Sequence, residues 1–65
     1  MIRLTKIFDL LGMETLITIY EGQTKLYFGE CGKCSRSIFN HAYVKKMKFD
    51  NQKGRYIIKV RYMYL

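Results

Sequence analysis

The spacing of apolar residues changes along the chain, and this change outlines its elements. From Leu4 to Leu11, apolar side chains recur at every third or fourth position, which is typical of one face of an α-helix. The spacing predicts a short strand or arm followed by a helix of about two turns. Thr5 is a candidate N-cap, and Gly12 is a candidate left-handed stop. Such a short helix must pack on the rest of the protein, because isolated helices of this length are unstable in water.

Residues 16–20 and 26–28 have the composition of two β-strands. Both runs consist entirely of β-branched, aromatic or leucine side chains. The segment 21–24 separates them, and its Gly22 is free to take a positive φ. The pattern therefore predicts a β-hairpin, and we expect Gly29 to end its ladder or to mark a bulge.

The rest of the chain predicts a second hairpin after an irregular connector. The connector, residues 31–43, has candidate caps in its serines and predicts one short helical turn around Phe39. Residues 43–49 and 55–65 alternate in character, and residues 50–54 between them contain the Asp, Asn and Gly that turns favour.

The order of these elements predicts an α+β fold in one domain, residues 1–65. We expect a small antiparallel sheet or open barrel made of two hairpins, with a short N-terminal helix against it. A chain of 65 residues has room for one domain. Apolar residues make up 49% of it, which is too many for a disordered segment.

Hydropathy and the few cysteines predict a cytoplasmic protein without a membrane span. No run of apolar residues is long enough to cross a bilayer. Asp9, Gly12 and Glu14 interrupt the one stretch that resembles a secretory signal. Two cysteines do not make a disulfide framework, and reduced thiols are typical of the cytoplasm.

The formal net charge of +7 is concentrated in the second half of the chain. Residues 1–30 contain three basic and four acidic residues, whereas residues 31–65 contain nine basic residues and one acidic residue. Such asymmetry indicates the kind of partner more than the fold. We expect a negatively charged partner, which is nucleic acid, an acidic protein surface or a nucleoprotein.

The basic residues of the second hairpin are the candidate binding site. If its apolar residues face the core, the alternating positions share the other face. They are Lys46, Lys48, Arg55, Lys59 and Arg61. Such cations repel one another, so the face is either simply solvated or neutralised by phosphates or carboxylates. Candidate rings for stacking on bases are Tyr27, Tyr43, Tyr62 and Tyr64.

The pair Cys31 and Cys34 has the spacing of half a zinc knuckle. A structural zinc ion requires four ligands, and only His41 follows as a further strong ligand. A redox pair is typically placed at a helix N-terminus after a strand of a βαβ unit, which this chain lacks. We favour ordinary reduced cysteines and no cofactor. A metal site at Cys31, Cys34 and His41, and a disulfide or redox pair, remain as alternatives.

No set of residues in the sequence predicts catalysis. His41 has no neighbouring nucleophile and orienting acid whose spacing places them on one surface. The chain also lacks a glycine loop that would cradle phosphates. We therefore expect a protein that is not an enzyme.

Four segments carry a resemblance to a known group of proteins. These are Leu10–Leu11, residues 15–22 (Thr-Leu-Ile-Thr-Ile-Tyr-Glu-Gly), residues 26–29 (Leu-Tyr-Phe-Gly) and Val44–Met47. In this arrangement the chain resembles small accessory proteins of bacteriophages of Gram-positive hosts. The resemblance implies a small open-barrel or α+β fold and an accessory role such as inhibition of host defence, as in the anti-CRISPR class. Cys31, Cys34 and the strong basicity depart from that pattern.

Three functions follow as hypotheses. The leading one is a stoichiometric binder that inhibits or modulates a nucleic-acid-handling complex, such as a CRISPR defence complex, in the cytoplasm of a host cell. The first alternative is direct binding of nucleic acid through the basic hairpin. The second is a structural or zinc-bridged homodimer, since residues 62–65 form an apolar tail that a small core does not fully cover.

Overall fold

A computed structural model describes residues 2–63 of the chain. Along the chain the elements are β1 (Ile2–Arg3), α1 (Leu4–Leu10), β2 (Leu16–Glu21), β3 (Thr24–Glu30), the 3-10 turns η1 (Cys31–Lys33) and η2 (Ser37–Phe39), β4 (Ala42–Asp50) and β5 (Arg55–Tyr62). Tyr64 and Leu65, which the sequence places in the last strand and its apolar tail, lie outside the described residues.

The five strands form one mixed sheet in the order β1-β4-β5-β2-β3. Each predicted hairpin is present, as the antiparallel pairs β2–β3 and β4–β5. The two hairpins are joined by a parallel pairing between β2 and β5, so the sheet is mixed and not wholly antiparallel. The predicted α+β class, with a small open sheet and a short N-terminal helix, is confirmed.

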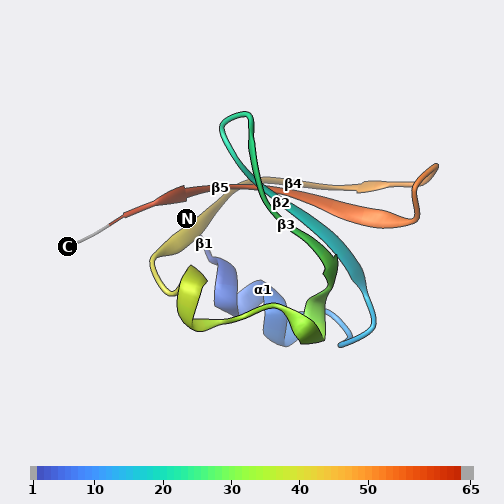
Figure 1. Ribbon diagram of the computed structural model, residues 1–65, viewed down its shortest axis with the longest axis horizontal. Coiled ribbons are helices and arrows are strands. Elements are labelled where there is room, and N and C mark those ends of the chain that lie inside the picture. Colours follow the sequence, from blue (N-terminus) through green and yellow to red (C-terminus); the bar gives the residue numbers. More distant parts are fainter. Residues whose placement is uncertain (1, 64–65) are drawn as a thin grey trace.

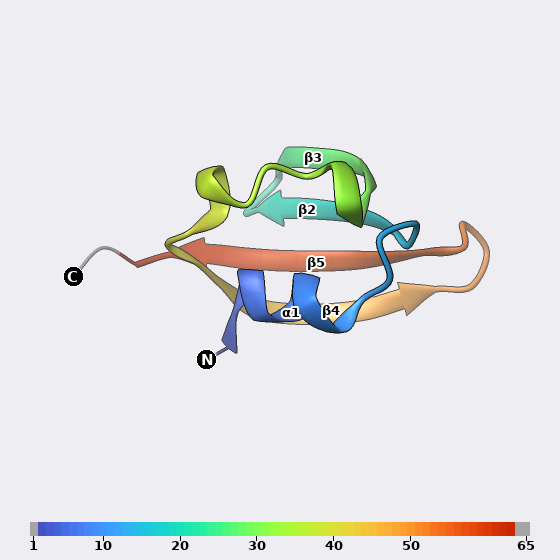
Figure 2. The ribbon, with the colours of Figure 1, turned by 90° about the horizontal axis from the view of Figure 1, so that it is seen from below.

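The molecule has two layers, as Figure 1 and Figure 2 show: α1, η1 and η2 lie on one side of the sheet. The core forms where this layer meets the sheet. Its buried apolar residues are Leu4, Ile7, Phe8, Ile17, Ile19, Cys31, Cys34, Phe39, Ala42, Ile58 and Val60. We call the other side of the sheet the open face; on β5 it carries Ile57, Lys59 and Arg61.

The start of α1 is decided by sheet pairing and not by a capping side chain. Ile2 and Arg3 pair with β4, and the helix begins at the next residue. Thr5 consequently lies inside the helix, so the prediction that it is the N-cap was wrong. The predicted left-handed stop at Gly12 was also wrong, because Leu11 is an extended C-cap and Gly12 has no positive φ.

The first hairpin turns at Gly22, whose φ of 61° fits the predicted use of this glycine. The ladder continues past Gly29, which pairs with Ile17, to Glu30. Its irregularity falls between Ile19 and Tyr20, so the expectation of a strand end or a bulge at Gly29 was wrong.

The second hairpin turns as its composition predicts. The Asp50 carboxylate accepts hydrogen bonds from the backbone N–H groups of Gln52 and Lys53, at 3.0 and 3.1 Å. Gly54 has a φ of 65° and donates its N–H to the Asp50 carbonyl at 2.8 Å. In the connector, η2 is the predicted short turn, but no serine side chain caps it.

Replacing Ile58 with valine tests the core contact between β5 and the helical layer. Ile58 is fully buried, so Ile58→Val should lower the free energy of unfolding by about 0.5–1.5 kcal/mol. The matched control is Ile38→Val, at a side chain that is 66% exposed, with an expected change within about 0.5 kcal/mol. Urea denaturation measures both, and equal effects would contradict this placement of the core.

Candidate functional site

Sheet register places four predicted binding residues on the open face. Residues paired directly across a ladder project to the same side of the sheet. Ile58 and Val60 are buried under the helical layer, so Lys59 and Arg61 project to the open face. Lys59 pairs with Lys46, and Ile57 pairs with Lys48. Lys46, Lys48, Lys59 and Arg61 therefore share one side, and all four are exposed.

Three of these lysines surround a shallow depression. Lys46, Lys48 and Lys59 line it together with Ile57, and its volume is about 30 Å³. Lys46 and Lys59 are direct cross-strand partners, and such like-charged pairs are unfavourable. Long lysine stems can cover Ile57 while their ammonium groups stay in water. We call this feature the lysine depression.

The cations of the open face are not neutralised by the protein's own acids. The ion pairs found among residues 2–63 are Lys33–Glu30, at 3.6 Å, and Arg36–Asp9, at 2.7 Å. Asp50 is the acid at the end of the β4–β5 ladder, and its carboxylate caps the hairpin turn. The positive potential of the face is therefore available to another molecule.

Arg55 lies on the same face but is not an exposed binding residue, which corrects the prediction. Its side chain is 8% exposed. The Arg55 Nη1 donates to Thr18 Oγ1 at 2.9 Å and to the Ile17 carbonyl at 3.4 Å, and Cζ lies 3.6 Å from the centre of the Phe28 ring. The parallel pairing of β2 with β5 brings these partners beside Arg55. No local sequence pattern predicts the pairing of β2 with β5.

Two further cations, Arg3 and Lys25, join the open face and were missed in the sequence. Arg3 Nη2 donates to the Tyr43 hydroxyl at 3.1 Å, and its guanidinium lies 5.6 Å from the centre of that ring. The Lys25 ammonium lies 5.2 Å from the centre of the Phe28 ring. Regular alternation would place Lys25 on the side of Tyr27, and the register shift in the β2–β3 ladder brings it to the side of Phe28 instead. Finding Arg3 required knowledge that β1 pairs with β4.

Of the predicted stacking tyrosines, the structure places Tyr43 on the open face. Tyr27 and Tyr62 instead pack against the core, and Tyr64 lies outside the described residues. The Tyr27 hydroxyl donates to the Glu30 carbonyl at 2.7 Å. Desolvation, with nearby Cys34 next in importance, raises the pKa of Tyr27.

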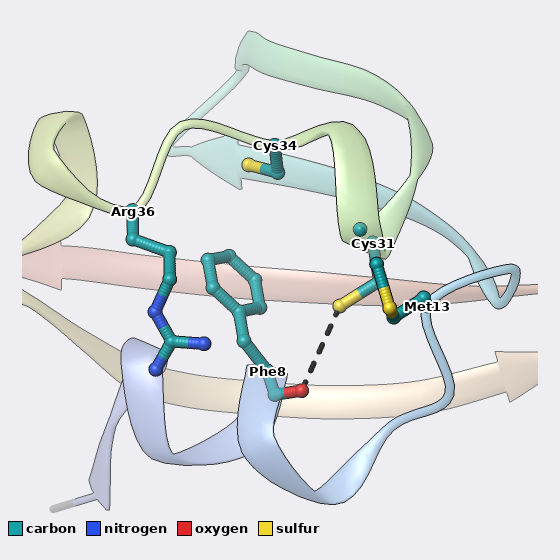
Figure 3. Close-up of a pocket in the computed structure, with 6 residues that line it drawn as sticks. Phe8, Met13, Cys31, Cys34 and Arg36 are labelled. Atoms are coloured by element: carbon teal, nitrogen blue, oxygen red, sulfur yellow. Dashed lines mark hydrogen bonds between the residues drawn. The ribbon is translucent and has the colours of Figure 1, made fainter.

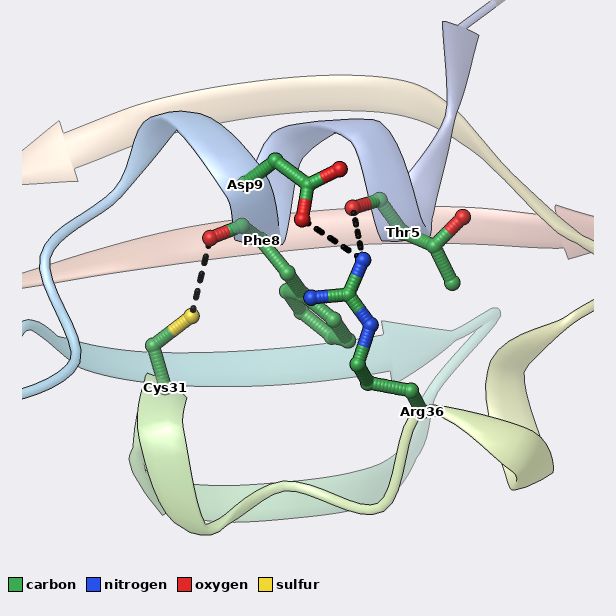
Figure 4. Close-up of polar contacts among 5 residues, drawn as sticks. All are labelled: Thr5, Phe8, Asp9, Cys31 and Arg36. Carbon is green, nitrogen blue, oxygen red and sulfur yellow. Dashed lines mark hydrogen bonds and ion pairs between the residues drawn. The ribbon is translucent and has the colours of Figure 1, made fainter.

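The two cysteines are buried in the core with raised thiol pKa values. Cys31 donates weakly to the Phe8 carbonyl, with Sγ and O 3.9 Å apart (Figure 4). Burial raises the pKa of Cys31, and Arg36 partly opposes this. Burial, followed by the effect of Cys31, raises the pKa of Cys34 to about 11. Both thiols are free, and these pKa values favour the protonated form that neither binds metal nor attacks disulfides.

The structure does not assemble the alternative metal site. His41 is exposed just before β4, whereas Cys31 and Cys34 are buried beneath the connector. Figure 3 shows the sulfur atoms of the two cysteines apart from each other. Among residues 2–63, no group of three histidine, cysteine or acidic side chains is arranged to hold a metal ion.

A cavity of about 260 Å³ lies between α1 and the connector (Figure 3). It is lined by Phe8, Met13, Cys31, Gly32, Cys34 and Arg36. Arg36 holds the connector to α1, because its Nη2 donates to the Thr5 carbonyl at 3.1 Å and to Asp9 Oδ1 at 2.7 Å (Figure 4). The lining is mainly apolar and sulfur-containing, and it brings together no acid–base pair.

No family model, curated protein or solved structure matches this chain. Within residues 2–63, no helix has the length and apolar character needed to cross a membrane.

Replacing Arg55 with alanine tests its structural role. Arg55→Ala should lower the free energy of unfolding by about 1.5–3 kcal/mol, because it leaves buried acceptors without a charged donor. The control Arg61→Ala removes the same charge from an exposed position, and should change stability by no more than about 0.5 kcal/mol. Urea denaturation at one pH compares the variants. An Arg55→Ala protein as stable as the Arg61→Ala protein would show that the buried contacts do not contribute.

The buried thiol of Cys34 predicts a loss of stability in alkali. Folding raises the pKa of Cys34 from its ordinary value of 9.0 to about 11, so the folded state holds this proton more tightly than the unfolded state does. The resulting stability is complete below pH 9 and is lost as the pH rises toward 11. The free energy of unfolding should therefore fall more steeply over this range in the parent than in Cys34→Ala. Equal slopes in denaturation measured across the range would contradict the prediction.

Proposed function

We propose that this protein is a small, non-enzymatic binding protein that engages a nucleic-acid-handling complex through the open face of its sheet and inhibits or modulates it by stoichiometric binding. The observation that carries the proposal is the gathering of exposed cations on one uncovered side of the sheet. Lys46, Lys48, Lys59 and Arg61 lie there without ion pairs to the described acids. A complex that contains nucleic acid offers the matching negative surface.

The energetics of the open face support a partner of opposite charge. Cross-strand repulsion between lysines costs up to about 1 kcal/mol for each pair, and a bound anion removes this cost. A large positive face also accelerates encounters with a negative partner. Both effects weaken as salt is added, because exposed charges are screened beyond about 10 Å at moderate ionic strength.

The likeness to phage accessory proteins supports the inhibitory role within this proposal, and the cytoplasm of a host cell is the compartment we propose. There a defence complex, such as a CRISPR nucleoprotein, combines phosphate and acidic protein surface. The two free thiols, Cys31 and Cys34, fit a reducing compartment.

Capture from a bacterial lysate tests the proposed role of the face. The immobilised parent protein should retain complexes that contain both protein and nucleic acid, and Lys59→Ala combined with Arg61→Ala should retain much less. The matched control combines Lys6→Ala with Lys53→Ala, which removes the same charge from exposed positions on α1 and in the β4–β5 turn. Gel analysis of the protein and nucleic acid retained, with and without added salt, provides the measurement.

Equal retention by the parent and the Lys59/Arg61 variant would show that the open face is not the contact. Equal losses in that variant and the Lys6/Lys53 control would show that total charge, and no particular face, is responsible. Either result overturns the proposal.

A further inference from the structure

We infer that the group recognised by the open face is the phosphate backbone of duplex nucleic acid, bound at the lysine depression without stacking on bases. This deepens the function proposed above and rests on it. The inference comes from two features of the face: its aromatic rings lie against cations or between them, and its exposed polar groups are mainly cations.

The aromatic rings of the open face are already in contact with cations or placed between them. Phe28 is 61% exposed, yet the buried guanidinium of Arg55 stacks on it at 3.6 Å, and Lys25 approaches it as well. Proteins that bind single strands without sequence preference use free aromatic faces on which bases stack. The Arg55 side of the Phe28 ring is closed to a base, because hydrogen bonds to β2 hold the guanidinium there.

The other two rings of this face show the same arrangement. The Arg3 guanidinium lies 5.6 Å from the centre of the Tyr43 ring and donates to its hydroxyl. Tyr20 is half-buried, and its strand neighbours are Lys25 on β3 and Lys59 on β5. The face therefore offers cations where a stacking platform would offer open rings.

The lysine depression fits the charge of a phosphate backbone. Three exposed ammonium groups surround it, and Ile57 forms an apolar floor that supports the lysine stems. Lysine binds phosphate as a point charge, without the fixed geometry that reads a base edge.

The duplex is the favoured form because it presents phosphate at higher density. Double-stranded DNA carries one negative charge for about every 1.7 Å of its axis, and each neutralised phosphate releases counterions. A single strand has half that density and gains its remaining affinity from stacking, which this face does not favour. The open face should therefore bind a duplex more tightly than a single strand of equal length.

The test is a titration of purified protein into labelled DNA, a duplex and a single strand of equal length, followed by fluorescence anisotropy at several salt concentrations. We expect tighter binding of the duplex, with log K falling linearly against log salt. The variant Lys46→Ala, Lys48→Ala, Lys59→Ala should reduce the magnitude of that slope by about 2.7, since each phosphate contact contributes about 0.9.

Two control proteins make the result specific. The first combines Lys6→Ala, Lys33→Ala and Lys53→Ala, which removes three charges from positions outside the lysine depression and should change the slope by less than about 1. The second is Phe28→Leu, which keeps an apolar cover over Arg55 but removes the ring. It should bind within about threefold of the parent, whereas loss of one stacked base weakens binding about five- to 150-fold.

The inference is overturned by tighter binding of the single strand, by equal slopes in the two triple variants, by a large loss in Phe28→Leu, or by no binding of the duplex at low salt. The experiments distinguish failure of this inference from failure of the proposed function. Capture that depends on Lys59 and Arg61 but survives nuclease, with no binding of purified duplex, would mean that the face meets an acidic protein. Duplex binding without capture of any complex would leave the inference standing and remove the proposed function.

Discussion

The parallel pairing of β2 with β5 is the contact on which the remaining structure depends. It joins two hairpins into one sheet and sets Ile17 and Ile19 beside Ile58. These side chains share one buried cluster with Leu4, Ile7 and Phe8 of the short helix α1, and without such packing a helix of seven residues is unstable in water. The core of this small protein therefore exists only when both hairpins are in place.

Burial of one side of the sheet determines which residues lie on the other side. Successive residues of a strand project to opposite sides, so once Ile58 and Val60 lie under the helical layer, Lys59 and Arg61 must project outward. The repulsion among the outward cations is an unfavourable term in the folding of an already small protein. A partner that supplies negative charge removes that term on binding, which links the packing of the core to the proposed function.

Chemical groups of the same type have different roles here because their surroundings differ. Arg55 and Arg61 both project to the open face, but Arg55 is held by Thr18 and Phe28, whereas Arg61 is exposed. The first arginine joins β5 to the first hairpin, and the second remains available to a partner. The buried thiols of Cys31 and Cys34 likewise contribute to packing, since burial favours their protonated forms.

The sequence by itself determined both hairpins, the short helix and the shared face of Lys46, Lys48, Lys59 and Arg61, because the period of a strand is two and apolar alternation shows which side is buried. Tertiary structure decided the parallel junction, the burial of Arg55 and the addition of Arg3 and Lys25 to the open face. It also set the start of α1 through β1, in place of the cap expected at Thr5. These features depend on contacts between residues distant in the chain, and local periodicity contains no information about which strands become neighbours.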